Sequence, residues 1–185
     1  MATDVDGRWH LGIGDPTVIG WVTVAAYGVA ALLCYRCNKR YARTEQGQFW
    51  LVLTTVMLAF GINKQLDLQT WLTEIGRDAA FEYGWYGRRR VVQALFIAGL
   101  LISALLMRDW LSQKVSGMGK YVRRASMGLL VLGLFVLIRA TSFHHIDEIL
   151  GFSLDGLSIN EVLELSGIFI VIWASSSRLW NIDVR

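Results

Sequence analysis

The chain has 185 residues, of which 54% are apolar and only 18% are charged, and its formal net charge is +3. Soluble domains carry roughly 25% charged residues, so this composition, with a mean hydropathy of +0.42, excludes an ordinary soluble domain and predicts a multi-pass membrane protein. The basic balance does not indicate nucleic-acid binding, because membrane proteins concentrate Lys and Arg in their cytoplasmic loops.

The chain begins with a short polar stretch. Residues 1–15 contain acids and lack the basic start of a secretory signal, so the first apolar block is expected to remain in the protein as a span. In "GIGDP", we expect Asp15 to cap the first helix and Pro16 to occupy its first position. These two roles explain the motif "GIGDP", so we assign no catalytic role to Asp15.

Five apolar stretches approach the length of about 20 residues that a helix needs to cross hydrocarbon. Several of them carry polar residues at one end, which neighbouring helices must shield. The sequence therefore predicts a single all-α domain over residues 1–185, a polytopic membrane helix bundle with about five transmembrane helices. The predicted spans are 17–35, 49–63, 91–107, 125–142 and 161–178.

Small residues in these spans predict close packing between helices. Cys34 and Cys37 form a C-x-x-C string at the end of the first span, but neither a redox-type βαβ unit nor further metal ligands accompany it. We therefore interpret both cysteines as packing residues. The other small residues lie in the third and fifth spans: Gly99, Ser103, Ala104, Ser166, Gly167, Ala174 and Ser175.

Segment 63–90 is the longest stretch outside the predicted spans. Its polar and apolar residues both recur at about helical spacing, which predicts an amphipathic helix that either projects from the membrane or lies in its interface. Trp85 and Tyr86 favour the interface, where amphipathic rings collect.

The basic residues predict the orientation. Loops 36–48 and 108–125 are rich in Lys and Arg and carry few acids, so the positive-inside rule places them in the cytoplasm, with the N-terminus outside and the C-terminus inside. Arg88, Arg89 and Arg90 oppose this assignment, because they precede the third span on the outer side.

These three arginines are also candidate ligands for an anion. Arginine side chains bind phosphate and carboxylate groups through two parallel hydrogen bonds, so with Trp85, Tyr86 and Arg139 they form a candidate site for a lipid headgroup. The alternative is that they are interfacial arginines that extend to the membrane surface.

A polar cluster follows the fourth span in "IRATSFHHIDEIL" (residues 138–150). Polar groups at this depth tend to face the bundle interior and pair with one another. We expect Arg139 to pair with Glu164 or Asp67, and Glu164 to require a proton or a cation.

The histidines of this cluster leave three alternatives open. With nearby carboxylates they suit a divalent metal such as zinc, one of them suits a general base, or they are structural. Candidate catalytic residues are His144, His145, Asp147, Glu164 and Asp67, and candidate metal ligands are His144, His145, Asp147, Glu161 and Glu164.

Three stretches, "GINKQLDLQTWLTEIGRDAAFEYGWYGRRRVVQ" (residues 61–93), "RATSFHHID" and "EVLELSGI", resemble a group of small bacterial inner-membrane proteins. The group has no established activity. The resemblance implies a location in the bacterial inner membrane and suggests that the polar stretches on the outer side belong to one site.

Two functions agree best with this pattern, and a third, a carrier of a proton, an ion or a redox cofactor, is disfavoured by the small number of spans. The first is an accessory or assembly subunit, in which the outer polar network orders the bundle and docks a larger membrane complex or a second copy. The alternative is a membrane-embedded enzyme, which we expect to be metal-dependent if the histidines are ligands, acting on a lipid or lipid-linked substrate. Membrane lipids are expected partners in both cases.

Overall fold

The computed structural model describes residues 15–66, 89–141 and 159–180, together with residues 74, 75, 78 and 82. These parts of the chain are helical, apart from short connecting turns, so the predicted all-α class is confirmed. The helices are α1 (Val18–Arg40), α2 (Glu45–Leu66), α4 (Arg89–Val115), α5 (Lys120–Thr141) and α7 (Ile159–Trp180).

Four of these helices, α1, α2, α5 and α7, are long and apolar enough to cross a membrane. A helix of 22 residues such as α2 is about 33 Å long, which matches a hydrocarbon core of about 30 Å. The chain is therefore a multi-pass membrane protein. The predicted third span lies within α4, a helix of 27 residues.

The helices extend beyond the spans expected from the apolar stretches. For example, α2 begins at Glu45 rather than at residue 49, and α1 continues to Arg40 rather than ending at residue 35. Polar residues at the membrane surface can continue the helical hydrogen-bond ladder, so the apolar stretch sets only the minimum length of each helix. In the predicted amphipathic segment, α2 is described to Leu66, and most of the segment beyond it lies outside the described residues.

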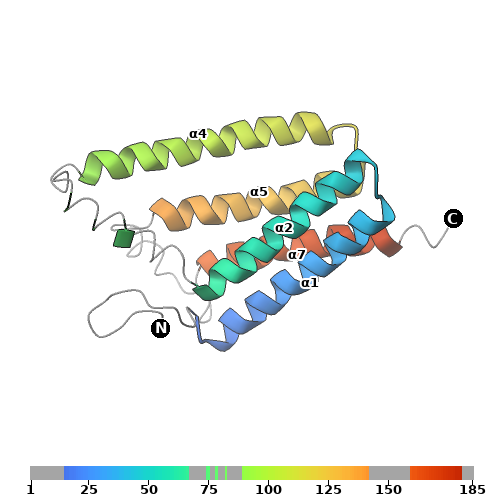
Figure 1. The fold of residues 1–185 in the computed structure, drawn as a ribbon, viewed down its shortest axis with the longest axis horizontal. Helices are drawn as coiled ribbons and strands as arrows, with labels where there is room; N and C mark the ends of the chain where they lie inside the picture. The colour runs from blue at the N-terminus through green and yellow to red at the C-terminus, as the bar shows by residue number, and fades with distance from the viewer. Residues whose placement is uncertain are drawn as a thin grey trace.

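The turn between α1 and α2, the turn between α4 and α5, and the C-terminal end of α7 lie at the same end of the molecule (Figure 1). The second turn includes Gly119, whose φ of 93° falls in the left-handed region that favours glycine. Figure 1 also shows α4 running beside α5, and α5 is the main contact of α4.

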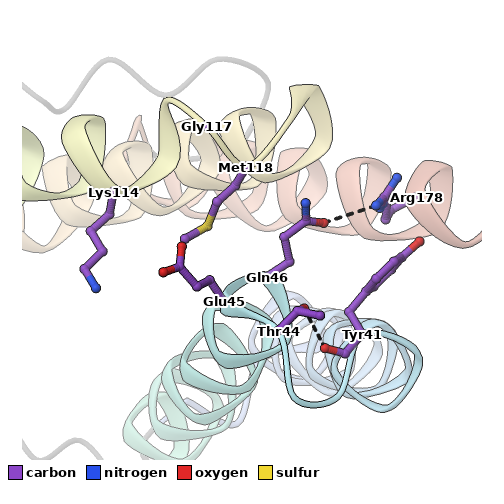
Figure 2. Close-up of a pocket in the computed structure, with 8 residues that line it drawn as sticks. All are labelled: Tyr41, Thr44, Glu45, Gln46, Lys114, Gly117, Met118 and Arg178. Atoms are coloured by element: carbon purple, nitrogen blue, oxygen red, sulfur yellow. Dashed lines mark hydrogen bonds between the residues drawn. The ribbon is translucent and has the colours of Figure 1, made fainter.

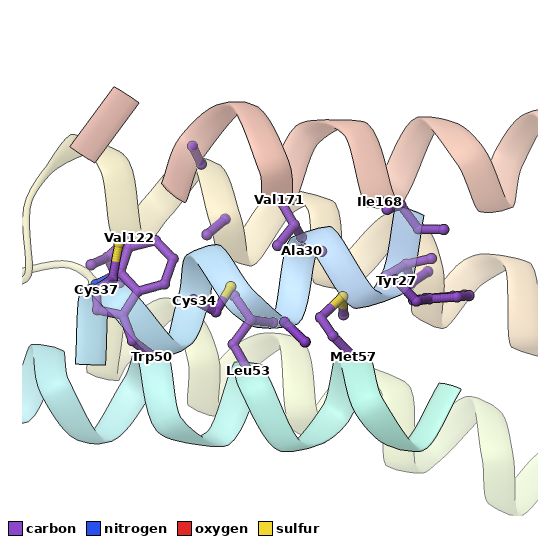
Figure 3. Packing of buried hydrophobic residues seen from close by; sticks show 14 of the residues in the cluster. Tyr27, Ala30, Cys34, Cys37, Trp50, Leu53, Met57, Val122, Ile168 and Val171 are labelled. Carbon is purple, nitrogen blue, oxygen red and sulfur yellow. The ribbon is translucent and has the colours of Figure 1, made fainter. Parts of the chain in front are cut away.

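The core contains buried side chains from all five described helices, and the helix pairs in closest contact are α1 with α2, α5 with α7, and α1 with α7. Cys34 on α1 is small and fully buried, and the large buried side chains of Trp50, Leu53 and Met57 on α2 point toward α1 (Figure 3). Lipid tails are as apolar as these side chains, so close fit rather than escape from water holds the helices together.

Both cysteines are buried and unbonded, and the Cys37 thiol lies 3.5 Å from the carbonyl oxygen of Ser175. This agrees with their interpretation as packing residues.

The predicted close helix packing is found between α5 and α7. A Cβ atom on Gly167 would lie 2.7 Å from the Leu132 side chain, and one on Gly128 would lie 2.9 Å from the Gly167 carbonyl oxygen. The two backbones approach so closely that neither position has room for a side chain. The same expectation is not met at Gly99 of α4, because among the described atoms nothing lies within 4 Å of its added Cβ.

Candidate functional site

The candidate site lies where α1 begins, opposite the end that carries the two turns. Thr17 is the N-cap of α1, and its hydroxyl oxygen accepts a hydrogen bond from the Gly20 amide at 3.0 Å. Asp15 was expected to be the cap, and this is wrong. Its carboxylate instead accepts hydrogen bonds from the backbone amide and hydroxyl of Thr17, at 3.2 and 2.6 Å, and Pro16 precedes the helix.

Lys64, in the last turn of α2, joins two acids from different parts of the chain. Its Nζ atom lies 3.1 Å from Oε2 of Glu164 and 3.3 Å from Oδ2 of Asp15. The side chains of Lys64 and Glu164 are 10% and 4% exposed. The other carboxylate oxygen of Glu164 accepts a hydrogen bond from the Tyr27 hydroxyl at 3.1 Å. We call Asp15, Tyr27, Lys64 and Glu164 the Lys64 network.

The Lys64 network connects three helices through an ion pair and a hydrogen bond to Glu164. Glu164 on α7 is held from α1 by Tyr27 and from α2 by Lys64. A carboxylate buried among apolar helices is stable only when it is paired and hydrogen-bonded, and here both of its oxygens have partners. Of the proton or cation that Glu164 was expected to require, the structure shows a cation, Lys64, which the sequence interpretation had not considered.

The electrostatics of Asp15 follow from the same contacts. Burial opposes the ionisation of Asp15, but the hydrogen bonds from Thr17 and the nearby Lys64 ammonium outweigh burial and hold the pKa of that carboxyl below its usual value. Asp15 is therefore ionised across the physiological pH range.

A small cavity of about 30 Å³ adjoins the Lys64 network, and Arg139 of α5 lies on its wall together with Glu164. Arg139 and Glu164 therefore line the same cavity, and the cation that pairs with Glu164 is Lys64. The expected pairing of Arg139 with Glu164 or Asp67 remains a prediction. A space of this size holds a water molecule or two, since one water needs about 10–15 Å³ of such volume. The lining residues are Tyr27, Phe60, Asn63, Lys64, Phe135, Val136, Arg139 and Glu164.

Most of the other predicted site residues lie outside the described part of the chain. Glu161 lies in the first turn of α7, and the backbones of Arg89 and Arg90 form the start of α4. Within the described ranges, no three His, Cys, Asp or Glu side chains group as metal ligands would, and the metal site remains a prediction. The predicted residues outside these ranges are Asp67, Trp85, Tyr86, Arg88, His144, His145 and Asp147.

The sequence interpretation missed Lys64 and Tyr27. Lys64 comes directly after the predicted second span, in the segment expected to lie outside the spans, and Tyr27 lies in the apolar run "VAAYGVAA". A polar hydroxyl in the middle of such a run was the available signal, because a buried Tyr hydroxyl usually has a hydrogen-bond partner.

The opposite end of the bundle is basic and aromatic. The Arg124 guanidinium lies 4.7 Å from the centre of the Trp173 ring, and Lys39 lies 5.5 Å from that of Tyr35. A cavity of about 420 Å³ opens at this end, with Arg178 on its wall (Figure 2).

Comparisons of the chain with known protein families, with curated proteins and with solved structures match nothing.

Proposed function

We propose that this protein is an accessory subunit of a larger membrane assembly, in which the Lys64 network orders the bundle and α4 docks a transmembrane helix of the partner. The observation that carries the proposal is the position of Lys64 between Asp15 and Glu164, at 3.3 and 3.1 Å. Such a network stabilises one arrangement of α1, α2 and α7.

The geometry of the Lys64 network favours a structural role over a catalytic one. A general acid or base must be within hydrogen-bond reach of a substrate, whereas both oxygens of Glu164 are already bonded to Tyr27 and Lys64. The adjoining cavity of about 30 Å³ is far smaller than the roughly 300 Å³ at which ligand pockets begin.

The docking surface is supported by the exposed face of α4. Leu95, Ile102 and Leu105 are more than half exposed, at 68%, 58% and 57%. They fall at positions i, i+7 and i+10 along the helix, which is the a and d spacing of helices that pack along a seam. Gly99, one turn after Leu95, has open space beyond its Cα, and small residues allow a second helix to approach.

The orientation is part of the proposal. The end with the two turns carries Lys and Arg side chains that lie over Tyr and Trp rings. Aromatic rings occur at both membrane interfaces, whereas an excess of Lys and Arg is typical of the cytoplasmic side. We therefore place this end in the cytoplasm and the Lys64 network on the outer side of the bacterial inner membrane.

Photo-crosslinking in native membranes tests the docking surface. A photoreactive residue at Ile102 should give one discrete protein adduct, whereas one at Phe169, an even more exposed apolar residue of α7 (67%), should give none. Gly99→Leu should abolish the adduct from Ile102 without lowering the melting temperature, since the added side chain meets no described atom within 4 Å of its Cβ. Lipid adducts alone at both positions, or a dimer of this chain, would refute the docking of a partner.

A further inference from the structure

The larger cavity lies at the end of the bundle opposite the Lys64 network. It has a volume of about 420 Å³, within the usual range for ligand pockets. The turn after α1, the first turn of α2, the turn after α4 and the end of α7 all contribute to its wall (Figure 2). The lining residues are Tyr41, Thr44, Glu45, Gln46, Lys114, Gly117, Met118 and Arg178.

Arg178 is held in a fixed position on this wall. Its Nη2 atom donates a hydrogen bond to Oε1 of Gln46 at 3.1 Å, and its guanidinium lies 4.4 Å from the centre of the Tyr41 ring. A cation positioned before a ligand arrives loses little entropy on binding, and the planar guanidinium suits a phosphate.

Two buried donors at the cavity lack an acceptor. Among the described residues, neither Nε of Arg178 nor the hydroxyl of Tyr41 has a hydrogen-bond partner. Buried polar groups are normally satisfied, so each such group needs a specific explanation. Both residues line the cavity, and an oxyanion there would supply the acceptors after a small adjustment of the wall.

The cavity also contains an acid. Glu45 lines it between Lys114 and Gln46, as Figure 2 shows. An anionic ligand without a positive group would be attracted by Arg178 and Lys114 but repelled by Glu45. A ligand with both a phosphate and an ammonium group would match all three charges.

The position of the cavity along the membrane normal indicates where such a ligand comes from. The Arg178 guanidinium lies 5.6 Å from the ring centre of Tyr121, at the start of α5. Lys120 and Arg124 lie 5.1 and 5.9 Å from the same ring centre. Aromatic and basic residues gather in this way at the level of the lipid headgroups. The nearest ligand that carries both a phosphate and an ammonium group is therefore the headgroup of a phospholipid in the adjacent leaflet.

We infer that this cavity binds the headgroup of an amine-bearing phospholipid, with the phosphate at Arg178 and the primary ammonium at Glu45. Phosphatidylethanolamine has this chemistry. The site is independent of the docking surface on α4, and Glu45 gives it selectivity against anionic lipids that lack an ammonium group.

Native mass spectrometry of the detergent-purified full chain tests this inference. The protein is titrated with phosphatidylethanolamine or phosphatidylglycerol of the same acyl chains, and we expect about tenfold tighter binding of the first, the effect of one charge-assisted hydrogen bond. Glu45→Gln, a change at an exposed side chain, should remove this preference. Asp109→Asn, the same change of charge at an exposed residue that is not part of the lining, should preserve it.

A second arm tests the phosphate contact and the source of the ligand. Arg178→Gln should weaken the binding of both lipids, while Lys39→Gln should weaken neither. Soluble glycerophosphoethanolamine should compete poorly with the whole lipid. The inference is overturned if the two lipids bind equally to the unaltered chain, if Glu45→Gln leaves the preference intact, or if the soluble headgroup competes as well as the lipid.

Discussion

Lys64 shows at the scale of a single residue how this bundle tolerates charge. Its ammonium is nearly buried, yet it contacts a carboxylate on each of two sides. Removing one member of a buried pair leaves the other charge without compensation, which costs more than the pair itself contributes.

We predict that Lys64→Met lowers the free energy of unfolding by about 2–3 kcal/mol, because Glu164 is left buried without its cation. Thermal unfolding in detergent, followed by circular dichroism, measures this. Lys39→Met is the matched control, since Lys39 is exposed, and it should change stability by less than about 0.5 kcal/mol. Equal effects of the two substitutions would contradict a structural role for the Lys64 network.

The lowered pKa of Asp15 leads us to predict that the stability of the folded protein depends on pH. Its pKa is lower in the folded protein than in the unfolded chain, so its ionised form is favoured by folding. The stabilisation is fully present above the unfolded pKa of about 4 and is lost as the pH falls through the folded value. The difference in melting temperature between the unaltered chain and Asp15→Asn should therefore be largest near neutral pH and shrink toward pH ~3. A difference that stays constant over this range would exclude Asp15 as its source.

The close approach of α5 and α7 decides packing at the scale of the helices. A Cβ atom added at Gly128 would lie 2.9 Å from the carbonyl oxygen of Gly167 and 2.8 Å from the side chain of Val171. Packing without a hydrophobic driving force depends on such contacts, so even one methyl group should separate the helices.

Gly128→Ala should destabilise the protein by about 1–3 kcal/mol through overpacking. Gly133→Ala on the same helix is the control, because nothing in the described structure lies within 4 Å of the added Cβ, and it should be neutral or slightly stabilising owing to the better helix propensity of Ala. Melting temperatures in one detergent compare the two variants, and a reversed order would show that α5 and α7 are not in close contact.

The whole molecule has one polar end, with the Lys64 network, and one basic, aromatic end, and our proposed orientation places the second end in the cytoplasm. A cysteine in place of Ser116, which is exposed in the turn between α4 and α5, tests this assignment. The native cysteines are buried and should not react. A membrane-impermeant maleimide should label Ser116→Cys after permeabilisation but not in intact cells, because the positive-inside rule places this turn inside. Labelling in intact cells would invert the topology.

Several properties of this protein could be predicted from its amino-acid sequence alone. The lengths of the apolar stretches determined that the chain crosses a membrane as helices, since backbone groups in hydrocarbon must be bonded within each segment. The pattern "LELSGIFIVIW" placed Gly167 at a helix contact and Glu164 in need of a cation. These are local properties, and they do not depend on which helices become neighbours.

Only the tertiary structure determines which residues interact with one another. Lys64, Tyr27 and Glu164 are far apart in sequence, and no local pattern indicates that α2 supplies an ion pair and α1 a hydrogen bond to Glu164. The cavity at Arg178 likewise combines residues from both turns and the end of α7. Charge and hydropathy along a chain determine what must be paired or buried, whereas the packing of whole helices determines with what, because that choice depends on the fit of many side chains at once.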